Sequence, residues 1–532
     1  MTNPSTERPL YRWYVLAVLV VVYAFSYVDR QIVTVLAPYL KADLNITDAQ
    51  LGLLYGTTFA LFYGVFGIPL AKLADGWSRV RTLALGLSFW SLMTSFSGAA
   101  SSFAALGTAR IGVGVGEASS TPAAISLLGD YFERSRRGTV LGFYSVGVYV
   151  GAGVSLMIGG SVVAFWAKNY PDRATAPFGL AGWQAAFMAV GIPGLLLALL
   201  ILLTIREPVR GRLEAVAPGN DTTPFRSALR ELSAMVPPFN LIRMAREGRP
   251  RGEIIKNIVW IIGAFLFCAV VTAATDSALL PPRRAVLAQV AGVSITSNLV
   301  QWIAMAIAFY AVASWFQSVR LRDPLASRLM TGSPTFRALT LAGAFLAFAM
   351  NSTTGFVFVY ANRYLGFTAA DGFHLGAIAA ISGGIGITTS GYLSDIAYRI
   401  TPTGRLTFVC VTASLFTLAS LIQFTTNNVT TFYICYSVAT FFVPMWFAPN
   451  QATTQDLVVP RLRGTAFAMY SLGANIIGLG LGPYSVGLIS DATGNLRTAI
   501  LCALATLPLT IITMIYAARH LPDGERIARE SL

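Results

Sequence analysis

The chain is a series of long apolar stretches separated by short polar linkers. Typical stretches are WYVLAVLVVVYAFSYV (residues 13–28) and GIPGLLLALLILLTI (residues 191–205), and such stretches have the length that a bilayer-crossing helix needs. Backbone polar groups in hydrocarbon must be satisfied within the segment, so the stretches are predicted to be helices. Spans are expected near residues 12–38, 50–74, 80–98, 103–131, 138–166, 181–205, 257–280, 297–316, 337–361, 373–395, 404–425, 430–456, 464–490 and 497–519.

Composition supports an all-α polytopic membrane protein. Hydrophobic residues make up 55% of the 532 and charged residues only 12%, whereas about a quarter of a soluble chain is charged. The alternation of an outer-membrane barrel strand is absent. Cysteines lie only inside apolar stretches and the two histidines are isolated, so packing is favoured over disulfides, and neither a metal site nor a cofactor is expected: Cys268, Cys410, Cys435, Cys502, His374 and His520.

The net charge of +14 is distributed as membrane topology requires, and not as nucleic-acid binding would require. Residues 205–337 alone contribute a net +8, in stretches that flank apolar segments. Lys and Arg concentrate on the cytoplasmic side of membrane proteins. The basic linkers ADGWSRVR (residues 74–81) and ERSRR (residues 133–137) therefore predict cytoplasmic amino and carboxyl termini.

Two phrases recur at matching places in the chain. RGTVLGFYSVG (residues 137–147) returns 326 positions later as RGTAFAMYSLG, and AKLADGWSR (residues 71–79) returns 320 positions later as GYLSDIAYR. Two echoes in the same order indicate two related six-helix halves. A parallel repeat of this kind is typical of the major facilitator fold, which places the substrate site midway between the halves.

The halves are predicted to be separated by an insert. The expected divisions are a bundle at 1–205, a cytoplasmic linker with two extra helices at 206–336, a second bundle at 337–519 and a cytoplasmic tail at 520–532. If the extra helices cross, the chain has fourteen spans. The alternative is twelve spans plus a hairpin that does not cross, because crossing would place Arg283 and Arg284 outside. Residues 224–252 are expected to form an interfacial helix or a solvated loop.

Ionisable residues inside the predicted spans are candidates for a functional site. An ionisable side chain near the bilayer centre costs about 2.5–3.5 kcal/mol and by default marks a pathway or a proton relay. Asp29 of span one and Arg110 of span four lie at comparable depth and are expected to pair, with Glu117 two turns further along the same helical face. Arg30 is expected either to hold an anionic headgroup or to extend outward. A static buried network is the structural alternative.

The second half has no acid or base inside spans 337–361 and 430–456. A cavity between the halves would therefore be charged on one wall and polar to aromatic on the other, which suits an amphiphile with an anionic head. The candidate wall residues, each of which could instead only pack, are Tyr144, Asn351, Ser352, Thr353, Tyr360, Trp446, Asn450 and Asn475.

The repeated linker motifs place acids and arginines at the predicted cytoplasmic ends of the spans. We expect these groups to latch the halves together until the cavity opens inward; the alternative is that they only set topology and cap helices. The set comprises Asp75, Arg79, Arg81, Asp130, Arg137, Asp395, Arg399, Asp456 and Arg463.

The first half resembles a known family. SYVDRQIVTVLAPYLKADLNITDAQLGLL, LADGWSR, ARIGVGVGEASSTPA and GWQAAFMAVGIPGLLLALL are similar to the Spinster branch of the major facilitator superfamily. The resemblance implies alternating access with proton coupling, transport of lysophospholipids or sphingoid phosphates as in animal members, and functional roles at Asp29, Arg30, Arg110 and Glu117. Ala71 and Gly76 depart from the linker pattern, and the two-span insert is not typical.

The sequence thus predicts a proton-coupled secondary transporter for a lipid-like or other amphiphilic organic anion. An organic-acid symporter or drug exporter is the alternative within transport, and a non-transporting membrane receptor or scaffold is the alternative of another class. The expected partners are a small amphiphile, protons and the lipid bilayer. We expect a monomer, and the short loops indicate a bacterial inner membrane. No pattern of an enzyme or of nucleic-acid binding is present.

Overall fold

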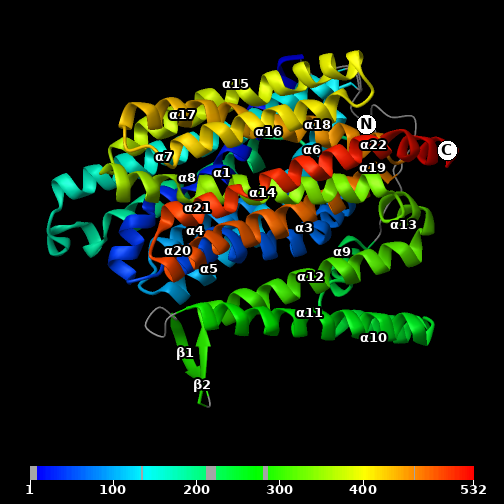
Figure 1. The fold of residues 1–532 in the computed structure, drawn as a ribbon, viewed down its shortest axis with the longest axis horizontal. Coiled ribbons are helices and arrows are strands. Elements are labelled where there is room, and N and C mark those ends of the chain that lie inside the picture. Colours follow the sequence, from blue (N-terminus) through cyan, green and yellow to red (C-terminus); the bar gives the residue numbers. More distant parts are fainter. Residues whose placement is uncertain are drawn as a thin grey trace. The chain divides into compact units, whose positions relative to one another are not determined.

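The computed structural model describes residues 9–133, 136–210, 223–279, 285–290, 292–459 and 462–531. These residues form helices joined by short linkers, with one two-stranded hairpin (Figure 1). All fourteen predicted spans coincide with helices, and twelve of these helices are long and apolar enough to cross a membrane. The prediction of an all-α polytopic membrane protein is confirmed.

The first half contains the six predicted spans. The second span is one continuous helical rod in which a π-helical segment, η1, joins α2 to α3. The elements are α1 (Pro9–Leu44), α2 (Asp48–Gly52), η1 (Leu53–Thr57), α3 (Thr58–Gly76), α4 (Arg79–Ser97), α5 (Phe103–Glu117), α6 (Ser120–Tyr131), α7 (Arg137–Asn169), η3 (Arg173–Thr175), η4 (Pro177–Gly179) and α8 (Gly182–Thr204).

The insert contains three short helices, a two-stranded hairpin and two long helices. It comprises α9 (Pro224–Ser233), α10 (Phe239–Arg246), α11 (Arg251–Ala278), β1 (Val286–Val290), β2 (Val293–Thr296), α12 (Ser297–Arg322) and α13 (Pro324–Met330). The strands pair antiparallel, with Gln289 opposite Ser294. The length of α11 and α12 favours crossing over a shallow hairpin. Arg283 and Arg284 lie outside the described residues.

The segment before α11 is helical, so the alternative of a solvated loop is wrong for α9 and α10. Each helix exposes large apolar side chains, Phe225 and Leu229 on α9 and Phe239 and Ile242 on α10. Such an amphipathic helix suits the plane of a membrane interface. The hairpin β1–β2 was not predicted, because residues 281–296 carry no alternation long enough to distinguish a strand from a linker.

The second half contains α14 (Pro334–Leu365), α15 (Asp371–Ile400), α16 (Gly404–Gln423), α17 (Val429–Phe442), η6 (Val443–Trp446), α18 (Phe447–Asp456), α19 (Arg463–Gly473), η8 (Ala474–Leu481), α20 (Gly482–Thr493), α21 (Leu496–Leu504) and α22 (Leu507–Glu530). If the two inserted helices are left out of the numbering, residues 463–493 form span eleven. This span contains a π-helical segment, η8, between α19 and α20. The predicted tail continues α22 as helix as far as Glu530.

Polar side chains in the linkers determine where several helices begin. The Ser78 hydroxyl accepts the backbone N–H of Arg81 at the start of α4, and Ser102 accepts that of Ala105 at the start of α5. Thr47 and Gln50 form a reciprocal capping box at the start of α2. Each cap satisfies a backbone donor that a helix amino terminus leaves unpaired.

The chain divides into two compact units that do not follow the sequence halves. The first unit contains residues 1–36, 66–230 and 368–384, and the second contains 37–65, 231–367 and 385–532. The second unit therefore includes the end of α1, α2 and η1 from the first half. The first unit includes the beginning of α15 from the second half.

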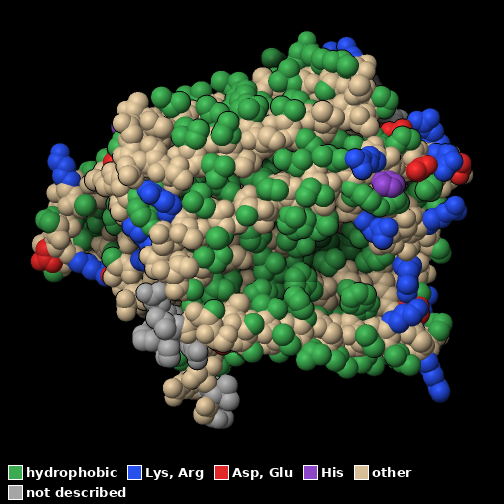
Figure 2. Space-filling view, viewed as in Figure 1, with side chains coloured by type: hydrophobic (Ala, Val, Ile, Leu, Met, Phe, Trp, Pro, Cys, Tyr) green, Lys and Arg blue, Asp and Glu red, His purple; other side chains and the backbone are tan. Residues whose placement is uncertain are grey.

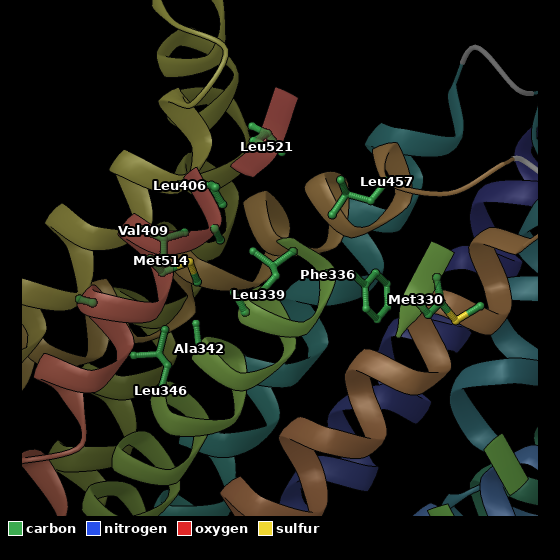
Figure 3. Close-up of a cluster of buried hydrophobic side chains, with 14 of the residues drawn as sticks. Met330, Phe336, Leu339, Ala342, Leu346, Leu406, Val409, Leu457, Met514 and Leu521 are labelled. Atoms are coloured by element: carbon green, nitrogen blue, oxygen red, sulfur yellow. The ribbon is translucent and has the colours of Figure 1, made fainter. Parts of the chain in front are cut away.

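The core of the second unit lies mainly between α14, α16, α18 and α22 (Figure 3). Leu339 and Leu346 of α14 are buried with Leu406 of α16 and Met514 of α22. On the same unit, hydrophobic side chains line the surface of α11 and α12, and Lys and Arg gather at the end that carries α10 and α13 (Figure 2). Only 11% of the most apolar stretch of α11 is buried, which suits a helix that faces lipid.

Candidate functional site

The four ionisable residues predicted inside the spans of the first half are buried and lie on two helices of the first unit. Asp29 and Arg30 are on α1, and Arg110 and Glu117 are on α5; their exposed fractions are 1%, 8%, 0% and 1%. Glycines allow α5 to approach its neighbour closely, because a methyl group on Gly116 would meet the backbone of Trp90 in α4. The predicted juxtaposition of spans one and four is present.

Asp29 and Arg110 meet, but not as the predicted ion pair. Nη1 of Arg110 donates a hydrogen bond of 2.9 Å to the backbone carbonyl of Asp29. In the described part of the chain, neither carboxylate oxygen of Asp29 accepts a well-formed hydrogen bond. The Thr94 hydroxyl, the Trp90 indole N–H and the Arg110 guanidinium nevertheless lie near this carboxylate. The carboxylate is therefore buried and weakly held.

The ion pair in this region joins Arg30 to Glu117. Nη2 of Arg30 lies 3.0 Å from Oε2 of Glu117, and the Ser26 hydroxyl donates to the same oxygen over 2.9 Å. The Arg30 guanidinium also lies 4.6 Å from the centre of the Tyr27 ring. The expectation that Arg30 extends outward is wrong, because Glu117 neutralises its charge inside the bundle.

Several candidate wall residues are engaged in packing. The Tyr360 hydroxyl donates to the backbone carbonyl of Phe424 over 2.8 Å, within an aromatic cluster. Tyr144 stacks on Tyr23 with ring centres 4.4 Å apart. Nδ2 of Asn450 donates to the Tyr470 hydroxyl over 3.1 Å. These contacts favour the packing alternative for Tyr360 and Asn450.

The other wall candidates are divided between buried and accessible positions. Thr353 donates to the Ala349 carbonyl of its own helix over 3.0 Å. Ser352 is fully buried, and its hydroxyl has no hydrogen-bond partner among the described residues. Asn351, Trp446 and Asn475 are half-buried. These three residues can still line a cavity.

At the predicted cytoplasmic end of the first half, one buried arginine holds three spans. Nε of Arg79 lies 2.7 Å from Oε1 of Glu207, and Nη1 pairs with Asp130. The Arg79 side chain is only 2% exposed. The second oxygen of Glu207 accepts the backbone N–H of Val80 over 2.9 Å and the Ser78 hydroxyl over 2.7 Å. This network joins α4, α6 and the segment after α8.

The second half has an equivalent group of ion pairs around Arg405, a residue that the repeated motifs do not contain. Arg405 pairs with Asp456 at 2.8 Å and with Asp395 at 3.2 Å, and it lies 4.2 Å from the centre of the Tyr398 ring. Asp456 is the repeat equivalent of Asp130, as predicted. The arginine at the start of span three is Arg405 and not Arg399, because α15 continues beyond the motif and delays the start of α16.

The remaining latch candidates make other contacts or are exposed. Arg137 donates to the Gly129 carbonyl over 2.7 Å, and Arg81 lies 6.0 Å from the centre of the Trp77 ring. Asp75, Arg399 and Arg463 are exposed, with Arg210 the largest attraction on Asp75. Each recorded ion pair of a latch candidate joins residues of the same half.

A further network at the opposite end was not predicted. The Asp48 carboxylate, 3% exposed, pairs with Lys41 and accepts from Arg363 over 3.0 Å at each oxygen. The Ser490 hydroxyl donates to Asp48 over 2.6 Å. The Asp491 carboxylate accepts the backbone N–H groups of Asp48 and Ala49. All these residues belong to the second unit.

No group of three His, Cys, Asp or Glu side chains that could hold a metal occurs among the described residues. The four cysteines are free thiols. The candidates for a functional site among the described residues are the ionisable groups given above.

Comparison with known proteins gives a match along the whole chain. The model of the Major Facilitator Superfamily matches residues 19–336 and 340–531. A protein from Mycolicibacterium smegmatis described as an MFS-type efflux pump is 25% identical over 496 residues, which cover 92% of this chain and 87% of that protein. Human protein spinster homolog 1 is 31% identical over 202 residues, which cover 38% of this chain and 35% of that protein.

The fold is also similar to a solved structure. A bacterial homolog to the human lysosomal transporter Spinster, in an inward-facing and occupied conformation, superposes with a TM-score of 0.64. It is 23% identical, and the match covers 98% of this chain and 99% of that chain. The predicted major facilitator fold and the resemblance to the Spinster branch are confirmed.

Proposed function

Because the chain belongs to the Major Facilitator Superfamily, a family of membrane transporters, we propose that it couples protons to the transport of an amphiphilic organic anion by alternating access. The observation that carries this proposal is the state of Asp29. Its carboxylate is buried inside a membrane bundle, and no well-formed hydrogen bond holds it among the described residues. A group in that position can exchange a proton at low cost in structure.

The two arginines nearby have different tasks in this proposal. Arg30 pairs with Glu117 and holds its carboxylate in place. Arg110 donates a hydrogen bond to the Asp29 backbone carbonyl, and its charge attracts the Asp29 carboxylate. When Arg110 moves to an anionic headgroup, Asp29 loses its attraction and takes up a proton, since an unpaired charge at this depth is costly.

The expected substrate follows from the contrast between the halves. The first half supplies the buried charges, and spans 337–361 and 430–456 supply polar and aromatic side chains such as Asn351 and Trp446. A ligand with an anionic head and an apolar body satisfies both walls. A drug exporter is the second candidate, favoured by the M. smegmatis efflux pump, which matches 92% of this chain.

Proton coupling is tested by transport into liposomes. With the purified protein and an imposed pH gradient, we expect Asp29→Asn to abolish gradient-driven uptake of a lysophospholipid and Arg110→Ala to lower it at least tenfold. Asp523→Asn, an exposed acid on α22 that pairs with Arg526, is the matched control and should transport like the parent.

The outcomes separate the alternatives. If Asp29→Asn still responds to the pH gradient like the parent, the proposed coupling residue is wrong. If only organic acids or drugs are carried, the substrate class is that of the alternative transporters. If no solute moves in any condition while the protein remains folded, the receptor or scaffold is favoured.

A further inference from the structure

The inserted helices contact both halves of the transporter within the second unit. α11 and α12 lie side by side (Figure 1). α12 packs against α2 and η1, which belong to the first half, and against η8, which belongs to the second half. The insert therefore bridges the two halves at the end opposite to the predicted cytoplasmic face.

Asn298 anchors the insert to span eleven. Its side chain, 3% exposed, donates to Asp276 Oδ1 over 2.7 Å and to Thr275 Oγ1 over 2.9 Å, which fixes α12 to α11. Its oxygen accepts the Tyr484 hydroxyl of α20 over 2.7 Å and the Trp302 indole N–H over 3.0 Å. Both the nitrogen and the oxygen of the Asn298 side-chain amide thus have hydrogen-bond partners. The partner outside the insert is Tyr484 of α20.

A second junction lies at the Gly480 carbonyl. This oxygen accepts the Thr57 hydroxyl of η1 over 2.5 Å and, at a longer 3.4 Å, the Gln301 amide of α12. Met305 of α12 and Ala60 of α3 would both lie within 4 Å of a methyl group on Gly480. First half, second half and insert meet at this point, and both η1 and η8 are π-helical, a geometry frequent at functional sites.

The other face of α20 closes against α2. A methyl group on Gly487 would meet the backbone of Asp48 and Ala49, and one on Gly52 would meet the backbone of Pro483 and Tyr484. The Ser490 and Asp491 bonds to the start of α2 lie along the same seam. α20 is therefore held between α2 on one side and Asn298 of the insert on the other.

We propose that the two inserted helices, α11 and α12, brace the closed outer side of the transporter. In this brace, Asn298 and Met305 position α12 across the seam between η1 and span eleven. This proposal rests on the alternating access proposed above. Opening the outer side separates α2 and η1 from α20 and η8, so α12 must lose one of its two sets of contacts. The insert thereby stabilises the outward-closed conformation.

The brace is tested by measuring the distance between spin labels on the two halves. Labels at Ala42 and Thr425, both exposed positions of the second unit, are introduced after the four native cysteines are replaced. We expect Met305→Ala and Tyr484→Phe to enrich a longer distance. For Tyr484→Phe the ratio of open to closed should rise roughly two- to tenfold, as loss of one net hydrogen bond predicts.

Two further variants make the result specific. Tyr310→Phe removes a hydroxyl that bonds Asn257 over 2.9 Å inside the insert, away from α20, and should leave the distances unchanged. Thr57→Val breaks the bond between the halves at Gly480 and should lengthen them. Monodispersity and thermal unfolding of each variant confirm that it is folded.

The brace is overturned if Thr57→Val lengthens the distance while Met305→Ala and Tyr484→Phe do not, or if Tyr310→Phe shifts it as much as Tyr484→Phe. Alternating access would instead be contradicted by one distance between the labels that stays the same in every folded variant and also after a candidate amphiphile is added under a pH gradient. The two failures are thus distinguishable.

Discussion

At the scale of single residues, three arginines at or near the core of the bundles form ion pairs with acids. Arg79 has Asp130 and Glu207, Arg405 has Asp395 and Asp456, and Arg30 has Glu117. The pairs of Arg79 and Arg30 are costly to break by removing one partner, because the remaining charge is left buried, whereas the acids that pair with Arg405 are exposed. Arg110 donates to the backbone carbonyl of Asp29, and in the proposed cycle it is the arginine that moves to the substrate.

Glu207 provides a test of the Arg79 network through pH. Burial raises the pKa of Glu207, but the Val80 N–H, the Arg79 guanidinium and the Ser78 hydroxyl together outweigh it and hold the pKa below its ordinary value of 4.5. Ionised Glu207 therefore stabilises the fold above pH 4.5, and this contribution is lost as the pH falls through the lowered value.

We expect Glu207→Gln to lower the melting temperature in detergent at pH 7, and the gap from the parent to narrow as the pH falls from 5 toward 3. Glu530→Gln, at an exposed position at the end of α22, controls for the loss of one carboxylate. A gap that stays constant over this pH range would show that the Glu207 charge does not contribute.

The sequence predicted some of the residues of these charged networks and missed others. Asp29, Arg110 and Glu117 were found because a charge inside an apolar stretch is conspicuous, and Asp130 and Asp456 because they precede a repeated phrase. Arg405 escaped the repeat, since its linker is longer than that of Arg79. Asp48 and Arg363 lie 315 positions apart, just outside the predicted spans and in stretches without any echo, so only the folded chain shows that they pair.

At the scale of elements, glycine determines how closely helices approach. In the first unit α7 crosses α15 where Gly153 and Gly376 face one another, and a methyl group on either would meet the backbone carbonyl of the other. Close approach through small residues is a main source of helix association in membranes. Gly384, on the same α15, has open space where a side chain would begin.

These two glycines of α15 should respond in opposite ways to alanine. Gly376→Ala should destabilise the protein by about 1–3 kcal/mol through overpacking, whereas Gly384→Ala should be neutral or stabilising by about 0.5–1 kcal/mol, because alanine favours the helix. Thermal unfolding of both variants in detergent checks this. Equal melting temperatures would mean that α7 and α15 do not cross at Gly376.

The existence of the membrane helices was predictable along the whole chain, because length and hydropathy are enough to identify such a helix. Element detail was not. The π-helical segments η1 and η8 arise where spans two and eleven pack together, a contact between distant parts of the chain that no local pattern encodes. The amphipathic α9 and α10 lay between two alternatives, since their few apolar residues fit either an interfacial helix or a loop.

At the scale of the whole molecule, topology is the property that the repeat predicts most directly. Both halves can share one orientation only if the insert crosses an even number of times, and α11 and α12 are each long enough to cross. We then expect the amino and carboxyl termini, and the basic linkers, to be cytoplasmic.

Cysteine labelling checks this topology in a background without native cysteines. Ser277→Cys, exposed at the end of α11, should react with a membrane-impermeant maleimide in intact cells. Arg399→Cys, exposed at the end of α15, should react only after the membrane is permeabilised. Protection of Ser277→Cys in intact cells would instead favour twelve spans and a hairpin that does not cross.

The buried cluster of α1 and α5 has a consequence for the electrical behaviour of transport. Asp29, Arg30, Arg110 and Glu117 have a formal sum of zero when both acids are ionised. The transmembrane voltage then does no net work on the cluster as it moves. One proton on Asp29 leaves a single positive charge, for which a full crossing is worth about 2.3 kcal/mol per 100 mV. The anionic head of a bound substrate cancels that charge, so voltage should bias only a step in which the cluster is protonated without substrate, and a current recording identifies that step.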